Sequence, residues 1–182
     1  MILACISIIV VAYVIHAYRK KIGSAECVAK RSNGEYIMTY QETKTDLFWV
    51  PAYYHLAHCI NGNYTLGAGI AKAFRDTMNM QNRLVSEYPI KDGEQTKYIG
   101  KALLVGNVFN LVTKAYHYNK PTYKMLYSAL EDMRDQCEAL GVKHLAMPKI
   151  GCGLDGLDWS KVSAMVKEVF GDLDIDILVC YL

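Results

Sequence analysis

Short apolar runs alternate with segments of helical spacing along most of this chain. The runs that predict strands cover residues 36–40, 54–60, 102–105, 108–112, 142–150 and 175–182. Apolar residues at intervals of three or four predict helices over residues 70–80, 80–88, 123–140 and 159–170. Because these strands and helices interleave, we predict an α/β fold in which helices cover both faces of one sheet.

Individual residues mark several ends of these elements. Thr122 and Asp158 each precede a predicted helix. A side-chain oxygen there accepts a hydrogen bond from a free backbone amide, so both are expected N-caps. Gly141 follows the helix over 123–140 and is its expected stop. Gly106-Asn107 separates two apolar runs and predicts a tight hairpin turn.

The first 21 residues form a separate hydrophobic segment. Ile2 to Tyr18 is apolar apart from a few positions, and a basic cluster at 19–21 follows. A bilayer is spanned by roughly 17–25 apolar residues, and a basic flank holds its side in the cytoplasm. We therefore expect a membrane-anchoring helix over 1–21, a polar linker over 22–35, and one cytoplasmic domain over 36–182.

Two alternatives stay open for the N-terminal segment. A cleaved signal peptide fits less well, because no basic residue precedes the apolar run. A misassigned start codon would place the first residue at Met38, and the protein would then be soluble in the cytoplasm or nucleus.

Two glycine-rich loops, residues 61–69 and 151–156, each follow a predicted strand and precede a predicted helix. Glycines let backbone amides approach an anion, and a helix N-terminus favours negative charge. If the two strands are neighbours, the loops form two walls of a cleft that suits a diphosphate. Neither loop has a Walker lysine or a GxGxxG pattern, which disfavours a nucleoside triphosphatase and a Rossmann dehydrogenase. Asp155 in the second loop would be repelled by phosphate, so it should face a ribose or a reacting carbon.

Composition narrows the function classes. A chain of 182 residues is one domain by size, and a net charge of +2 does not indicate nucleic acid as a partner. The six cysteines lack CxxC spacing, which argues against a zinc site and suits free thiols in a reducing compartment. We interpret Cys59 and Cys152 as packing residues and His58 as a core histidine.

Four segments resemble the macrodomain family. They are His58-Cys59-Ile60-Asn61, Leu66-Gly67-Ala68-Gly69-Ile70-Ala71, Lys120-Pro121-Thr122-Tyr123 and Met147-Pro148-Lys149-Ile150-Gly151-Cys152-Gly153-Leu154-Asp155. The branch that they resemble most is the terminal ADP-ribose protein glycohydrolases, also described as O-acetyl-ADP-ribose deacetylases. The similarity runs from about Tyr36 to Leu182. It implies a three-layer α/β/α fold with a mixed central sheet that binds ADP-ribose across one edge, without metal or cofactor. We expect a monomer.

The resemblance also implies which residues touch the ligand. Asp46 would contact the adenine amino group, although Thr45 replaces the usual glycine before it, and Asn61 would lie near the distal ribose. The residues expected on the diphosphate are Gly67, Ala68, Gly69, Ile70, Gly151, Cys152, Gly153 and Leu154. Flanking contacts are expected from Leu47, Thr113 and Ile150.

The resemblance gives Lys114 and Asp155 the catalytic roles. In this branch a lysine attacks the anomeric carbon of the ribose and a loop acid completes the hydrolysis. Ring opening exposes an aldehyde, which a neutral amine can trap as a Schiff base, and a carboxylate can then act as general base. An ion pair with Asp155 would instead hold Lys114 protonated, so the geometry of the pair matters.

The expected activity is removal of ADP-ribose from glutamate and aspartate side chains of ADP-ribosylated proteins, together with deacylation of O-acyl-ADP-ribose. Three alternatives stay open. They are a non-catalytic ADP-ribose reader, an ADP-ribose-1''-phosphate phosphatase, and a hydrolase whose substrate is ADP-ribose linked to nucleic acid.

Overall fold

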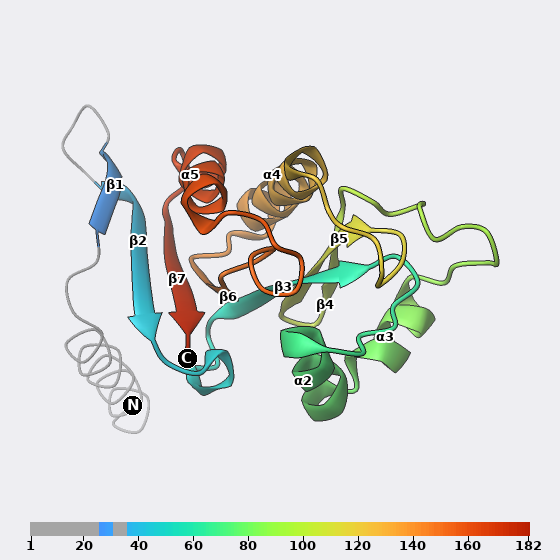
Figure 1. The fold of residues 1–182 in the computed structure, drawn as a ribbon. Helices are drawn as coiled ribbons and strands as arrows, with labels where there is room; N and C mark the ends of the chain where they lie inside the picture. The colour runs from blue at the N-terminus through green and yellow to red at the C-terminus, as the bar shows by residue number, and fades with distance from the viewer. Residues whose placement is uncertain (1–25, 31–35) are drawn as a thin grey trace, which may run out of the picture.

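The computed structural model describes residues 26–30 and 36–182, which form one seven-stranded sheet between two layers of helices (Figure 1). The strands, in chain order, are β1 Glu26–Lys30, β2 Tyr36–Lys44, β3 His55–Asn61, β4 Ala102–Val105, β5 Val108–Lys114, β6 His144–Pro148 and β7 Ile175–Tyr181. Their order in the sheet is β1-β2-β7-β6-β3-β5-β4. The five inner strands are parallel, and the edge strands β1 and β4 are antiparallel to their neighbours. The mixed sheet that the sequence led us to expect is confirmed.

Four α-helices cover the sheet over the described residues. They are α2 Gly69–Met78, α3 Met80–Glu87, α4 Tyr123–Leu140 and α5 Trp159–Phe170, and a 3-10 turn, η1 Leu47–Trp49, follows β2. Helices α4 and α5 lie on one face, and α2 and α3 lie on the other (Figure 1). The prediction of helices on both faces is therefore confirmed.

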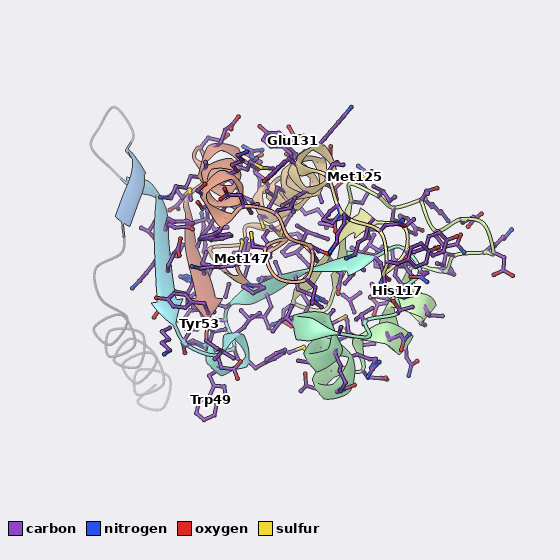
Figure 2. All side chains as sticks on the ribbon, in the orientation of Figure 1. Trp49, Tyr53, His117, Met125, Glu131 and Met147 are labelled. Atoms are coloured by element: carbon purple, nitrogen blue, oxygen red, sulfur yellow. The ribbon has the colours of Figure 1, made fainter. Side chains whose placement is uncertain are left out.

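Each face of the sheet has its own buried hydrophobic cluster. Leu126 and Leu130 of α4 and Val162 of α5 belong to one cluster, whereas Phe74 of α2 belongs to the other. The side chains of β6 alternate between the two clusters, as a strand covered on both faces requires. Figure 2 shows Met147 within the sheet layer, while Trp49 of η1 points out of the molecule and is 80% exposed.

The predicted N-caps Thr122 and Asp158 and the predicted stop at Gly141 are confirmed. Thr122 Oγ1 accepts a hydrogen bond from the Met125 amide at 3.2 Å, and Asp158 Oδ1 accepts one from the Ser160 amide at 2.8 Å. Gly141 ends α4 with φ +65°, a left-handed conformation that favours glycine. Each cap satisfies a backbone group that the helix itself leaves unpaired.

Asn79 separates α2 from α3 with φ +52°, a left-handed conformation that asparagine tolerates better than most residues. The predicted strand over 142–150 is shorter in the structure. Because the Ile150 amide turns back to the Pro148 carbonyl at 2.7 Å, the last residues of that run belong to the following loop.

The structure describes only part of the segment for which an anchor and a linker are predicted. β1 lies inside the segment 22–35 that the sequence suggests as a linker, and it pairs with β2 at the edge of the sheet. The anchoring helix expected over 1–21 lies outside the described residues, so it stays a prediction. Within the described part, no helix combines the length and the apolarity that a bilayer span needs.

Candidate active site

The candidate site lies where β6, β3 and β5 end side by side. All three strands are parallel and β3 is the middle one, so the loops that follow them leave the sheet at the same edge. The β3–β5 pairing runs up to Asn61 opposite Lys114, with a register shift just before that pair. The Gly62 amide then donates to the Lys114 carbonyl at 2.7 Å, which keeps the first glycine loop beside the end of β5. In parallel α/β sheets, ligands bind outside this carboxyl edge.

Lys114 and Asp155 meet over the end of β3. The Lys114 Nζ donates to the Asp155 Oδ1, and each side chain keeps only 13% of its surface exposed. Lys114 is the last residue of β5, and Asp155 lies in the loop after β6, so the two approach from opposite sides of β3. The structure thus brings together the amine and the acid that the sequence singled out.

Cys59 of β3 lies close to this pair but is a poor nucleophile. Burial raises the pKa of its thiol to about 12, and the negative charge of Asp155 adds to the rise, while Lys114 and the Gly151 amide offset part of it. Burial likewise raises the pKa of Cys152 to about 11, and its thiol donates to the Ile150 carbonyl at 3.2 Å. Both cysteines are protonated at neutral pH, which agrees with the packing roles predicted for them.

The first glycine loop is closed by Asn61. Its side-chain amide donates to Thr65 Oγ1 at 2.7 Å, and its Oδ1 accepts from the Thr65 amide at 3.0 Å. Asn61 therefore shapes the loop beside Lys114. Its expected position near the distal ribose stays a prediction. A Cβ at Gly62 would overlap the Gln95 carbonyl, so only glycine fits there, whereas Gly67 borders open space.

The two glycine loops face each other. A Cβ built on Gly69 would lie 3.8 Å from Leu154 Cδ1, and the Leu154 side chain is 70% exposed. Gly69 begins α2 with φ +56°, and Gly151 begins the second loop with φ +71°. These left-handed conformations favour glycine and turn the chain sharply at both places. The closeness of Gly69 and Leu154 brings the two loops together, and their role as two walls of one ligand cleft stays a prediction.

Other expected ligand residues have side chains committed to the fold. Leu47 and Ile150 are buried in the core, so each can offer a ligand only backbone groups, and the Ile150 amide already donates to the Pro148 carbonyl. Thr113 is also buried, and its hydroxyl is unpaired among the described residues. Asp46 is half-buried at the end of β2, and its Oδ1 accepts from the Phe48 amide at 2.9 Å to cap η1. Its second carboxylate oxygen remains an acceptor, and the expected contact with adenine stays a prediction.

Residues 57–166 match the sequence model of the Macro domain. That match covers more than half of the chain. The chain belongs to the macrodomain family. It is also 42% identical to the ADP-ribose glycohydrolase OARD1 of Homo sapiens over 138 residues, which cover 75% of this chain and 87% of the relative.

Two further comparisons concern a more distant relative and a solved structure. It is 25% identical over 135 residues to the ADP-ribose 1''-phosphate phosphatase of Candida albicans, covering 68% of this chain and 86% of the relative. The macrodomain of Thermus aquaticus DarG superposes with a TM-score of 0.64 at 20% identity, and the match covers 80% of this chain and 99% of that one. The second comparison supports the fold, since residue roles do not carry over at such low identity.

His58 has the core role in this macrodomain that the sequence suggested. It is fully buried, its Nε2 lies 2.7 Å from Asn110 Oδ1, and its ring stacks on Phe74 with 4.0 Å between centroids. Burial lowers the pKa of His58 to about 4, which keeps the ring neutral. The pairing with Asn110 was not predicted, because nothing in the alternation of residues along two separate strands shows which polar side chains will face each other.

Proposed function

We propose that this protein is a hydrolase that removes ADP-ribose from ADP-ribosylated glutamate and aspartate side chains and deacylates O-acyl-ADP-ribose. The observation that carries the proposal is the contact between Lys114 and Asp155 over the end of β3, between two glycine loops. Its 42% identical relative is named an ADP-ribose glycohydrolase, which supports the same chemistry. The partners implied are ADP-ribose and the proteins that carry it.

Binding would use backbone groups more than charged side chains. The first loop, through Gly67-Ala68-Gly69-Ile70, offers the amides at the start of α2. The second loop offers those of Gly151, Gly153 and Leu154, since the Cys152 amide already donates to the Lys149 carbonyl at 3.2 Å. A helix N-terminus and free amides stabilise a diphosphate without a metal ion. Asp46 at the end of β2 would hold the adenine and leave the distal ribose beside Lys114 and Asp155.

The reaction on a glutamate ester would proceed in two steps. Lys114 Nζ first gives a proton to Asp155, its contact partner, and the neutral amine attacks C1'' of the distal ribose. The bond between C1'' and the ester oxygen breaks, and the leaving carboxyl group takes the proton from Asp155. Transfer of a second proton from Nζ to O4'' accompanies the break of the C1''–O4'' bond, which opens the ring and leaves a Schiff base between C1'' and Nζ. Water then adds to C1'' with Asp155 as general base, the C1''–Nζ bond breaks with a proton returned to Nζ, and free ADP-ribose and Lys114 are regenerated.

Turnover and covalent trapping test this proposal together. Wild-type protein should release ADP-ribose from an ADP-ribosyl-glutamate peptide, Lys114→Ala should abolish the release, and Asp155→Ala should accumulate an adduct at Lys114 that borohydride reduction and mass spectrometry detect. Lys143→Ala is a matched control, because Lys143 is exposed and pairs with Asp174 at the opposite end of β6.

The alternatives give different outcomes in the same assay. Tight ADP-ribose binding without turnover by wild-type protein would identify a reader. Phosphate release from ADP-ribose-1''-phosphate that survives Lys114→Ala would favour the phosphatase, an activity named for the 25% identical relative. Release from an ADP-ribosylated oligonucleotide in preference to the peptide would identify nucleic acid as the carrier.

We also propose that Ile2–Tyr18 anchors the protein in a membrane with the macrodomain in the cytoplasm. The proposal comes from the length of the apolar run and its basic flank. Fractionation of cells that express the full chain, beside a version that begins at Ala25 and so retains β1, would test it. Equal distribution of the two versions in the soluble fraction would contradict an anchor.

A further inference from the structure

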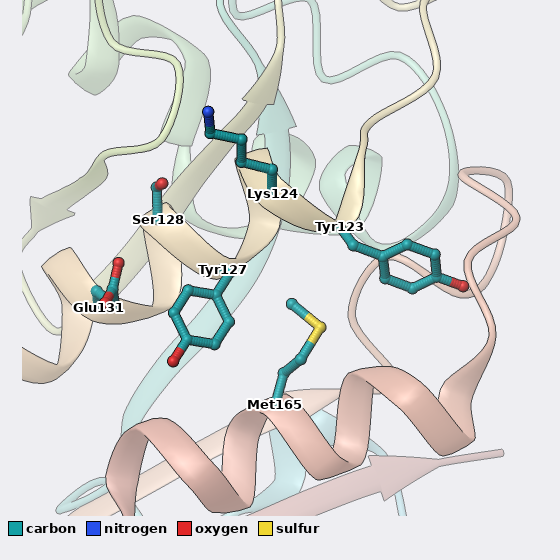
Figure 3. A pocket seen from close by; sticks show the side chains of 6 residues that line it. All are labelled: Tyr123, Lys124, Tyr127, Ser128, Glu131 and Met165. Carbon is teal, nitrogen blue, oxygen red and sulfur yellow. The ribbon is translucent and has the colours of Figure 1, made fainter.

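The segment Lys120-Pro121-Thr122-Tyr123 lies against the loop that carries Asp155. The Lys120 Nζ donates to the Leu154 carbonyl at 2.5 Å, and the Tyr123 hydroxyl accepts from the Asp158 amide at 3.1 Å. The two contacts hold the loop at points on either side of Asp155. Figure 3 shows the Tyr123 ring directed toward the loop that precedes α5, while Lys124, on the same turn of α4, points the other way.

Apolar packing from α4 supports the same loop. A Cβ built on Gly151 would lie 3.0 Å from Leu157 Cδ1 and 3.3 Å from Leu126 Cδ2, so these two side chains meet beneath the start of the loop. Leu126 is fully buried in α4. The loop therefore contacts Lys120, which precedes α4, and Tyr123 and Leu126 in the first turns of α4.

Helix α4 also packs on β5, the strand that ends in Lys114. Hydrogen bonds within the loop, from the Leu157 amide to the Gly151 carbonyl at 2.9 Å and from the Gly156 amide to the Gly153 carbonyl at 3.1 Å, set its internal shape. The contacts from Lys120 and Tyr123 instead set its position relative to α4, and through α4 relative to Lys114.

We propose that Lys120 and Tyr123 are positioning residues that hold Asp155 against Lys114. This inference rests on the hydrolase function proposed above. When these contacts are lost, the loop keeps its own turns, and the step that depends on Asp155 slows most. That step is the addition of water to C1'' of the Lys114 adduct, which breaks the bond from C1'' to Nζ and releases ADP-ribose.

Because Lys120 is exposed, its role in positioning the loop can be distinguished from a role in the stability of the fold. An exposed lysine that donates to a carbonyl contributes little to the stability of the fold, because water replaces either partner readily. A displacement of about 1 Å at a reacting group, in contrast, costs up to ~100-fold in rate. The loss should therefore appear in turnover while the melting temperature changes little.

The test compares Lys120→Met and Tyr123→Phe with two matched controls on α4. Lys124→Met removes a neighbouring exposed lysine, and Tyr127→Phe removes a hydroxyl that donates to Glu168 Oε1 at 3.0 Å, away from the loop. We expect kcat to fall about tenfold in Lys120→Met and several-fold in Tyr123→Phe, which is below the ceiling for a displaced catalytic group. The controls should match wild type, and Lys120→Arg should restore most of the rate.

Two further measurements make the result specific. Borohydride trapping during turnover should show a larger fraction of Lys114 adduct in both variants than in wild type, because hydrolysis of the adduct slows more than its formation. Amide hydrogen exchange over residues 151–158 should be faster in both, whether or not substrate is present. Wild-type rates, adduct fractions and exchange in Lys120→Met and Tyr123→Phe would overturn the inference, as would a common loss of adduct and turnover with a lowered melting temperature. Absence of turnover and adduct in wild type would instead overturn the proposed function.

Discussion

Lys114 Nζ and Asp155 Oδ1 are in direct contact from opposite sides of β3, with most of each side chain out of water. A charged pair that is largely desolvated persists only while both partners remain, because either charge alone would be left without compensation. The same contact supplies the acceptor that a lysine needs when it gives up a proton to attack a carbon atom.

The contact predicts non-additive effects on stability. Lys114→Met and Asp155→Asn should each lower the free energy of unfolding by about 1–3 kcal/mol, because each leaves one polar partner unpaired in a partly buried place. The double variant should cost less than the sum, with a coupling energy of about 1–2 kcal/mol. Urea unfolding of all four proteins measures this energy, and strict additivity would show that the pair does not interact in solution.

Substitution by alanine should destabilise the protein at one glycine of the first loop and leave its stability unchanged at another. Gly62→Ala places a Cβ on the Gln95 carbonyl, so we expect about 2–4 kcal/mol of destabilisation as the backbone shifts. Gly67→Ala meets nothing within 4 Å, so its stability should stay within about 0.5 kcal/mol of wild type.

Binding of ADP-ribose tests whether a ligand, and not the fold, requires glycine at position 67. If the diphosphate approaches the backbone at Gly67, calorimetry should show that Gly67→Ala weakens ADP-ribose binding about tenfold while its melting temperature is unchanged. Unchanged affinity in this variant would place the diphosphate elsewhere.

His58 should make the stability depend on pH between about 4 and 6.5. Its folded pKa, about 4, lies below the ordinary value of 6.5, so the unfolded chain binds more protons in this window. The free energy of unfolding therefore falls as the pH falls from 6.5 toward 4, by about 3 kcal/mol at 1.36 kcal/mol per pKa unit. Above pH 6.5 both states hold the ring neutral and the contribution of His58 is flat.

His58→Gln tests this assignment, because it keeps polar atoms near Asn110 and removes the titration. Chemical denaturation at several pH values should show that the stability difference between wild type and variant shrinks as the pH is lowered through this range. A difference that stays constant with pH would contradict the buried, neutral ring.

Cys59 should be inert although it lies near the reactive pair. With a pKa of about 12, its thiolate is scarce at pH 8, so alkylation by iodoacetamide should be at least ~100-fold slower than for a free cysteine. Cys59→Ala should retain the catalytic mechanism and lose at most about 2 kcal/mol of stability, because it removes one partly buried sulfur atom. Rapid labelling, followed peptide by peptide with mass spectrometry, would show an activated thiol instead.

The parts of this fold that the sequence predicts are those set by local chemistry. Thr122 and Asp158 cap the helices that they precede, and Gly141 ends α4, because each choice depends on a few neighbouring backbone groups. The break at Asn79 is harder to predict. Asparagine occurs both within helices and in left-handed conformations, so its neighbours alone do not decide between them.

The candidate site needed more than local pattern. The spacing of residues does not give the order β6-β3-β5, and the expectation that Lys114 would meet Asp155 came from the resemblance to a family. Leu47 shows the opposite case, since it lies at an expected ligand position yet its side chain packs in the core. Lys120 and Tyr123 contact backbone groups, which every residue has. The sequence therefore shows the segment that contains both residues but does not predict what they contact.

The central position of β3 has a consequence for synthesis and for damage. Lys114 and Asp155 lie 41 residues apart along the chain and face each other only after β5, β3 and β6 have assembled. A nascent chain that has not yet emerged as far as residue 155 has no reactive pair, and a chain cut between the two positions keeps one only while its fragments stay associated. Enzymatic turnover would therefore report that β5, β3 and β6 are assembled, and partly made chains or dissociated fragments would be silent.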